Sequence, residues 1–202
     1  MKTMQQFVET IKIEDGKALN LNFHQARMES TMRHFFVHTP VPMLSGVLSP
    51  TPDMHFYKAR VVYGGQGVED VQYAPYAMRE IRSLKLVEDN EIDYSFKSTD
   101  RTPLNRLTAQ KGDCDEVLIV KNGLLTDTSF TNVAVFDGER WLTPRHPLLM
   151  GTKRASLLER QVIKEADISV ETLMNAQKVS LINAMIDLGE IEITTQMVNR
   201  GL

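Results

Sequence analysis

Three two-residue turn signals constrain the fold of this 202-residue chain more than any other feature. Asp15-Gly16, Asn122-Gly123 and Asp137-Gly138 each stand between runs with the residue pattern of short strands. Asn-Gly and Asp-Gly dipeptides favour tight hairpin turns, because both residues tolerate positive φ. Hairpins join antiparallel strands, whereas parallel strands need a longer crossover. The sequence therefore predicts an antiparallel meander or barrel rather than a parallel sheet.

Residues 1–91 are expected to form a small α+β lobe. Apolar and polar residues alternate, as in half-buried strands, at 7–13, 17–21, 57–63, 68–73 and 81–87. The pattern changes to a helical period after Asn22, which is a suitable helix cap. Residues 37–53 are rich in Pro, Ser and Thr and predict a loop with a short helical turn.

Residues 92–202 are expected to form a larger lobe. Strands are predicted at 117–121, 124–125, 132–136, 140–143 and 179–183, and the last of these is expected to be the final strand. Helices are predicted at 103–110, opened by Pro103, and at 151–166. The predicted fold class is therefore α+β with two lobes, of which the C-terminal one is a barrel-like antiparallel lobe with helices.

Composition excludes several classes of function. The net charge of −3 gives no electrostatic footprint for nucleic acid. A single cysteine, Cys114, excludes an intrachain disulfide and, together with histidines that lack metal-ligand spacing, predicts no metal site. Residues 1–6 lack the apolar core of a signal peptide, and no apolar run approaches the ~20 residues that span a bilayer. We therefore expect a cytoplasmic protein with no nucleic-acid or membrane partner.

A series of short motifs identifies a family. In order along the chain they are Phe7-Val-Glu-Thr-Ile11, His24-Gln-Ala-Arg27, Lys97, Asp115-Glu-Val-Leu118, Asn122-Gly-Leu-Leu-Thr-Asp-Thr-Ser-Phe-Thr-Asn132, Thr143-Pro144, Leu148-Leu-Met-Gly-Thr-Lys-Arg154 and Ile182-Asn-Ala-Met-Ile186. Each motif alone is weak, but their order over residues 7–186 resembles the class IV aminotransferases, also called fold type IV pyridoxal-phosphate enzymes. The resemblance implies a fold like that of D-amino-acid aminotransferase, with pyridoxal 5'-phosphate in the cleft between the lobes, and a homodimer.

The resemblance also implies roles for individual residues. Lys97 stands where the family's Schiff-base lysine falls, and the same amine would move the substrate's α-proton. Asp127 would hold the proton on the pyridine nitrogen, although the family usually has Glu there. Arg27 would bind the phosphate in a bidentate manner.

Further phosphate contacts are expected from the start of the helix at 151–166. Gly151 and Thr152 would supply them there, and Asn183 with Ala184 would add a contact at the end of a strand. His24 and Asn132 are expected to be structural, Asn132 by bonding the backbone of the signature loop.

A small-molecule amino substrate is expected, and Arg60, Tyr57 and Tyr94 are candidates to contact its carboxylate. The chain starts later than typical members of the family and lacks the first strand, so that the substrate is the inference that transfers least well.

Three possibilities remain open for the function, and two of them are enzymatic activities. The Ile182-Asn-Ala-Met-Ile186 motif resembles aminodeoxychorismate lyases, which eliminate pyruvate from 4-amino-4-deoxychorismate to give 4-aminobenzoate, a folate precursor. The alternative is an aminotransferase that acts on branched-chain or D-amino acids and 2-oxo acids. A third reading is a degenerate relative that binds the cofactor without turnover.

Overall fold

The computed structural model describes residues 5–200, so the first four residues of the stretch tested for a signal peptide lie outside it. The chain forms two compact units. Unit 1 contains the residues up to Ala77 together with Phe96–Asp100, and unit 2 contains Met78–Ser95 and the residues from Arg101 onwards. The expected lobe boundary after residue 91 differs from this division, because residues 78–91 belong by their contacts to unit 2 and Lys97 to unit 1.

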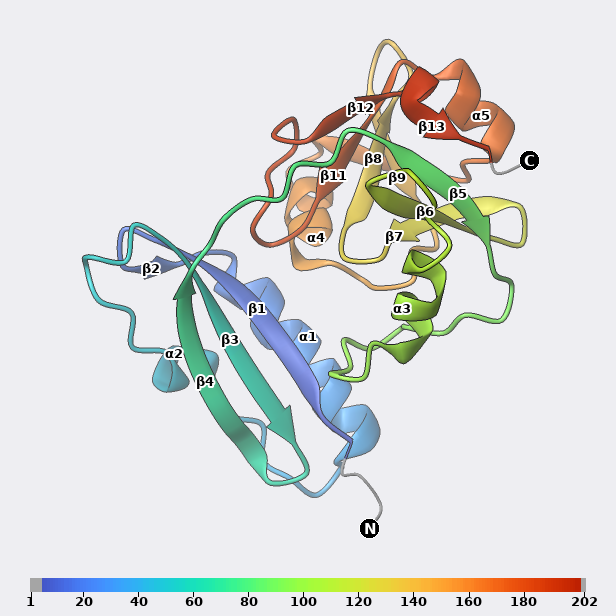
Figure 1. Cartoon of the computed structure of the whole chain (residues 1–202). Helices are drawn as coiled ribbons and strands as arrows, with labels where there is room; N and C mark the ends of the chain where they lie inside the picture. Colours follow the sequence, from blue (N-terminus) through green and yellow to red (C-terminus); the bar gives the residue numbers. More distant parts are fainter. Residues whose placement is uncertain (1–4, 201–202) are drawn as a thin grey trace. The chain divides into compact units, whose positions relative to one another are not determined.

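Unit 1 is an antiparallel sheet with one helix-covered face. The strands lie in the order β2 (Lys17–Ala18), β1 (Phe7–Glu14), β3 (Phe56–Gly64) and β4 (Gly67–Pro75). Helix α1 (Leu21–Phe35) lies behind this sheet in Figure 1, and the short α2 (Leu44–Val47) follows in the loop predicted at 37–53. Both residues of the Asp15-Gly16 turn between β1 and β2 have positive φ, as predicted for a tight hairpin.

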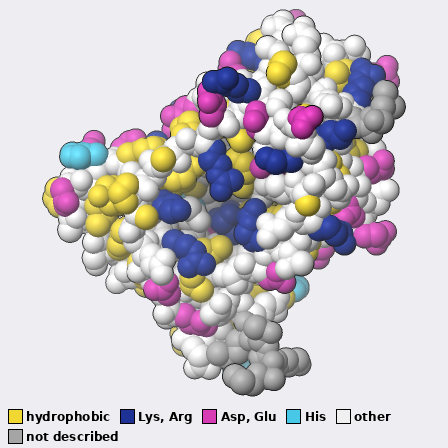
Figure 2. All heavy atoms as spheres, viewed as in Figure 1, with side chains coloured by type: hydrophobic (Ala, Val, Ile, Leu, Met, Phe, Trp, Pro, Cys, Tyr) yellow, Lys and Arg dark blue, Asp and Glu magenta, His cyan; other side chains and the backbone are white. Residues whose placement is uncertain are grey.

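The two faces of this sheet differ in chemistry because side chains alternate along each strand. Phe7, Ile11 and their cross-strand partners Tyr63 and Ala59 are buried in a core with Met28 and Met32 of α1. Thr10 and Lys12 are paired with Arg60 and Lys58, and these residues alternate with the core residues. Figure 2 views unit 1 from that second side, where Lys and Arg side chains lie among hydrophobic ones.

Helix α1 begins two residues earlier than predicted. Its N-cap is Asn20 rather than Asn22, and Asn20 takes a left-handed conformation with φ of 53° and makes no side-chain capping bond. Asn tolerates this conformation better than most residues, which lets the chain turn sharply from β2 into the helix.

Unit 2 is built on a nine-stranded sheet within the described residues. The main path runs β10-β9-β8-β7-β6-β5-β13, and β11 pairs with β8 and β12. The strand bounds are β5 Leu84–Glu88, β6 Glu116–Lys121, β7 Leu124–Thr128, β8 Asn132–Phe136, β9 Trp141–Pro144, β10 Ile163–Ala166, β11 Lys178–Ile182, β12 Glu192–Thr194 and β13 Val198–Asn199. Strands β6 to β9 form the predicted antiparallel meander, with Asn122 and Gly123 both at positive φ.

The prediction of purely antiparallel pairing is wrong at three places. Strand β5 is parallel to β6, β13 to β5, and β10 to β9. Parallel neighbours need a crossover, and helices supply two of them. Helix α3 (Thr102–Thr108) lies between β5 and β6, and α4 (Thr152–Glu159) lies between β9 and β10.

The helix predicted at 151–166 is half as long as expected. It ends at Glu159, Gln161 takes a left-handed φ of 56°, and residues 163–166 form β10. Ile163 is buried beside Leu157 and Trp141, and an apolar residue at this position fits both the helical and the strand pattern of the sequence. The strand at 179–183 is also not the last one, because β12, the 3-10 helix η1 (Thr195–Met197) and β13 follow it. The expected α+β class is confirmed in both units.

No helix among residues 5–200 is long and apolar enough to cross a membrane.

Candidate functional site

Lys97 is held by the backbone of unit 1. Its carbonyl accepts a hydrogen bond of 2.9 Å from the Val8 amide, and the next residue, Ser98, pairs with Phe7 at the edge of β1. Phe96, which precedes Lys97, stacks on His34 of α1 at a centroid distance of 4.7 Å and meets Phe35 edge-on at 4.8 Å. The main chain of Lys97 is therefore fixed on both sides, while its side chain remains half-buried.

A fully buried carboxylate joins two basic side chains in unit 1. Glu9 on β1 is 0% exposed and accepts a bidentate pair of bonds from Arg27 on α1, Nε to Oε1 at 2.9 Å and Nη2 to Oε2 at 2.6 Å. The Nδ1 of His24, one turn earlier on α1, lies 2.6 Å from Glu9 Oε2. Such forked Arg–carboxylate bonds fix the guanidinium plane as well as its position.

The charges in this cluster follow from burial and pairing. Burial alone would raise the pKa of Glu9, but the charge of Arg27 and the bonds from His24 and Arg27 lower it to about 2. Burial lowers the pKa of His24, and the charges of Arg27 and Lys97 act in the same direction against the attraction of Glu9. At neutral pH His24 is thus uncharged, and its Nδ1 donates a hydrogen to the ionised Glu9.

Arg27 therefore uses its Nε and Nη2 to bind Glu9. Its expected contact with the phosphate stays a prediction. Glu9 itself was not singled out from the sequence. A signal was present, because alternation along β1 puts Glu9 on the same face as Phe7 and Ile11. A carboxylate on a buried face needs a cationic or hydrogen-bonding partner, and the nearby helix carries both.

Two of the three candidate substrate residues, Tyr57 and Arg60, lie apart within unit 1. Tyr57 and Arg60 are an odd number of positions apart on β3, so they lie on opposite faces of the sheet. Tyr57 packs on the core of unit 1, whereas Arg60 lies 4.0 Å from Asp70 of β4 on the other face. Tyr94 is 8% exposed and belongs to the core cluster around Leu104 in unit 2. Their contacts with a substrate stay predictions.

Asp127, near the end of β7, is a buried carboxylate of unit 2. It is 5% exposed, and both of its oxygens accept hydrogen bonds, Oδ1 from Asn132 Nδ2 and Oδ2 from the Leu149 amide, each at 2.9 Å. Burial raises the pKa of Asp127 to about 7, while these donors and the charge of Arg154 act to lower it. A carboxyl group in this state can hold or share a proton near neutral pH.

The turn after Asp127 is fastened by residues whose roles the sequence did not reveal. The Ser129 hydroxyl donates to the buried Glu116 at 2.9 Å, and the Ser129 carbonyl accepts from Arg101 Nη2 at 2.8 Å. The Phe130 carbonyl accepts from Asn183 Nδ2 at 3.3 Å. These contacts join residues far apart in sequence, so no local pattern predicts them.

The predicted phosphate residues of unit 2 lie at two places, the start of α4 and the turn that follows β11. Gly151 is the N-cap of α4, and Thr152 is its buried first residue. Asn183 follows β11, and its Oδ1 accepts bonds from the amides of Met185 and Ile186, so its side chain closes a turn with Ala184 inside it. Phosphate contacts for these four residues stay predictions.

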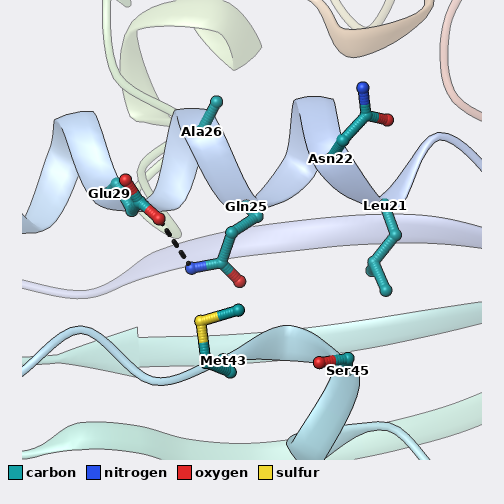
Figure 3. Close-up of a pocket in the computed structure, with 7 residues that line it drawn as sticks. All are labelled: Leu21, Asn22, Gln25, Ala26, Glu29, Met43 and Ser45. Carbon is teal, nitrogen blue, oxygen red and sulfur yellow. Dashed lines mark hydrogen bonds between the residues drawn. The ribbon is translucent and has the colours of Figure 1, made fainter.

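A separate hollow lies on the outer side of α1. Its seven lining residues, shown in Figure 3, are Leu21, Asn22, Gln25, Ala26, Glu29, Met43 and Ser45, and its volume is about 390 Å³. Gln25 crosses it and ties α1 to the following loop through Pro42 and Leu44. No predicted site residue lines this hollow. No group of three or more His, Cys, Asp or Glu side chains suited to a metal ion occurs among residues 5–200.

Comparison with known proteins shows several relatives. The model of the family described as "Amino-transferase class IV" matches residues 68–192. An uncharacterized protein of Haemophilus influenzae is 37% identical over 90% of this chain and 98% of its own length. The "Putative aminodeoxychorismate lyase" of Schizosaccharomyces pombe is 31% identical over 58% of this chain, which spans 54% of that relative.

Among solved structures, a "putative 4-amino-4-deoxychorismate lyase" from Haemophilus somnus 129pt superposes with a TM-score of 0.85. It is 35% identical and covers 93% of this chain and 100% of its own.

Proposed function

Because the chain belongs to the class IV aminotransferase family, which comprises pyridoxal-phosphate-dependent lyases and aminotransferases, we propose that it is an aminodeoxychorismate lyase. It would eliminate pyruvate from 4-amino-4-deoxychorismate and release 4-aminobenzoate. The likeness to the H. somnus protein over 93% of the chain carries this choice of reaction. The Ile182-Asn-Ala-Met-Ile186 motif supports it independently.

The described residues fit pyridoxal phosphate by their chemistry. A primary amine with an anchored backbone is available in Lys97, and a buried carboxyl group is available in Asp127. Arg27 supplies a cation, and the N-terminus of α4 supplies oriented N–H donors. When bound, the cofactor would supply an electron sink for the charge left at the substrate's α-carbon.

The protein's own residues would then divide the work. Lys97 Nζ would hold the cofactor covalently and, once released, would take the proton from the substrate's α-carbon. Asp127 would hold a proton at the ring nitrogen, a task that suits a carboxylate with two fixed hydrogen-bond donors. The Glu9–Arg27 pair would keep a guanidinium aligned in unit 1.

The first test is the assignment of Lys97. The purified protein, mixed with pyridoxal phosphate, should develop a visible absorption band at a longer wavelength than the band of the free aldehyde. Borohydride reduction should then fix the cofactor on the peptide that contains Lys97. The Lys97→Ala variant should lose both signals, whereas Lys164→Ala, at an exposed lysine of β10, should keep both. Absence of the band in the wild type, or labelling of another lysine, would refute the assignment.

The second test separates lyase from aminotransferase. Incubation with 4-amino-4-deoxychorismate and no 2-oxo acid should yield 4-aminobenzoate and pyruvate in equal amounts. Turnover that requires an added 2-oxo acid would instead identify an aminotransferase. Cofactor bound at Lys97 with neither activity would indicate a relative that binds the cofactor without turnover.

A further inference from the structure

The carboxamide of Asn132 is the centre of a closed group of hydrogen bonds in unit 2. Its Nδ2 donates both to Asp127 Oδ1 at 2.9 Å and to the Leu149 carbonyl at 2.8 Å. The Leu149 amide donates in turn to the other oxygen of Asp127 at 2.9 Å. Asn132, at the start of β8, is 6% exposed. Three segments of the chain, β7, β8 and the turn before α4, are thereby joined through one side chain.

The same carboxamide leaves no room for a side chain at position 151. A Cβ built on Gly151 would lie 1.8 Å from Asn132 Oδ1 and 3.0 Å from its Cγ. The φ of Gly151 is −72°, a value open to any residue, so space rather than backbone conformation requires glycine here. Asn132 cannot move away cheaply, because its Nδ2 is held by two bonds.

We propose that Asn132 is a positioning residue, which fixes the Asp127 carboxylate against the Leu149 backbone and makes glycine obligatory at position 151. This deepens the proposed function and rests on it for the cofactor role of Asp127.

The electrostatic consequence of this arrangement has a clear direction. A donor to a carboxylate favours the ionised form, so loss of the Asn132 bond should raise the pKa of Asp127 further. The charged group acting on Asp127 from the elements packed around it is Arg154 of α4, which is itself bonded to Glu165 of β10. That ion pair is left in place by a change at Asn132.

The test is a four-variant cycle on the full-length protein without cofactor. The 13C resonance of the Asp127 carboxyl is followed against pH in wild type, Asn132→Ala, Gly151→Ala and the double variant. Asn132→Ala should raise the pKa by about one unit, a tenfold change in proton affinity. Gly151→Ala should raise it similarly by displacing the carboxamide, but should add nothing in the Asn132→Ala background, where its methyl group has room.

Thr143→Val is the matched control. Thr143 is equally buried, and its hydroxyl bonds the Val133 carbonyl next to Asn132, so its loss disturbs the same strand without touching Asp127. It should leave the titration of Asp127 unchanged. An unchanged Asp127 titration in Asn132→Ala, or additive effects in the double variant, would overturn the proposal.

Asn132→Asp keeps the shape of the side chain and removes the donor, so it serves if Asn132→Ala does not fold. It should raise the Asp127 pKa even more, because a like charge is then adjacent; a wild-type titration would overturn the proposal. In protein loaded with ring-15N cofactor, the ring nitrogen should lose its proton at a lower pH in these variants. Failure to bind cofactor would sink the proposed function, whereas the cofactor-free titration tests Asn132 separately.

Discussion

Glu9 and Asp127 are both buried carboxylates, yet their environments drive their pKa values in opposite directions. Burial raises the pKa of Glu9, but the charge of Arg27 and the hydrogen bonds from His24 and Arg27 together outweigh that effect. Asp127 receives neutral donors from Asn132 and Leu149, which do not outweigh it. The motif around Asp127 made it a candidate site residue from the sequence alone. The sequence could not predict this difference, which depends on partners from other elements.

A pH-dependent loss of stability follows for Asp127. Its folded-state pKa of about 7 lies above the ordinary 3.8, so the folded protein holds the proton more tightly than the unfolded chain does. The contribution of the protonated Asp127 to the free energy of unfolding is therefore full at low pH and is lost as the pH rises toward 7. The difference in unfolding free energy between wild type and Asp127→Asn should therefore change by roughly 3 kcal/mol between pH 4 and pH 7. Urea unfolding of cofactor-free protein, followed by the fluorescence of Trp141, would measure it.

Trp141 is the one tryptophan of the sequence and lies on β9 in unit 2, so the signal reports the unit that contains Asp127. Asp113→Asn, at an exposed position of the same unit, is the control. Its unfolding free energy should follow the same pH dependence as that of the wild type. A parallel pH dependence for Asp127→Asn itself would contradict the raised pKa.

At the scale of elements, local patterns predicted the strands of the meander well, but they missed β10, β12 and β13 and placed the helix ends poorly. Alternation and the Asn-Gly turn located β6, β7 and β8, because both signals lie within the strands themselves. The end of α4 was missed because Ile163 suits the core in either a helix or a strand. Helix α5 (Val170–Asn175) was missed altogether, since six residues show little period.

The cap of α5 gives a prediction at this scale. The Ser169 hydroxyl accepts a bond of 3.0 Å from the Thr172 amide, which would otherwise lack a partner within the helix. Ser169→Ala should lower the unfolding free energy by about 1 kcal/mol. Ser169→Asp should keep most of this stabilisation, because its carboxylate can also accept the bond. Equal losses in the two variants, measured by urea unfolding, would show that the cap contributes nothing.

For the whole molecule, the two units carry opposite responses to acid. In unit 1 the lowered pKa of His24 means that the unfolded chain takes up a proton as the pH falls through ~6.5, while the folded one does not. Stability is therefore lost on acidification, and Glu9 adds a further loss as the pH falls from about 4.5 toward 2. In unit 2 acidification toward pH 4 restores the contribution of Asp127.

Hydrogen exchange resolved by peptide should show this contrast. Between pH 7 and pH 5, after correction for intrinsic rates, peptides from β1 and α1 should lose protection relative to peptides from β7 and β8. His24→Gln should remove the loss in unit 1 and leave unit 2 as it was. A uniform response of all peptides would mean that the two units open together and that the local pKa values do not set their separate stabilities.

The division into units was beyond the reach of the sequence. The sequence suggested one boundary after residue 91, but the pairing of Phe7 with Ser98 joins segments that are far apart along the chain. Nothing in either segment alone specifies the other as its partner. The short motifs singled out Lys97 and Asp127 as candidates, whereas Glu9 and the bonds of Asn132 required the fold.

The pairing of Lys97 with β1 also bears on how the protein is made. The ribosome releases β1 early, but the amide of Val8 can find the Lys97 carbonyl only after residues 78–95, which belong to the other unit, have emerged. The nascent first unit must therefore wait with the edge of β1 near Val8 unpaired until the lysine arrives. The segment that carries Lys97 is therefore the last part of unit 1 to emerge from the ribosome.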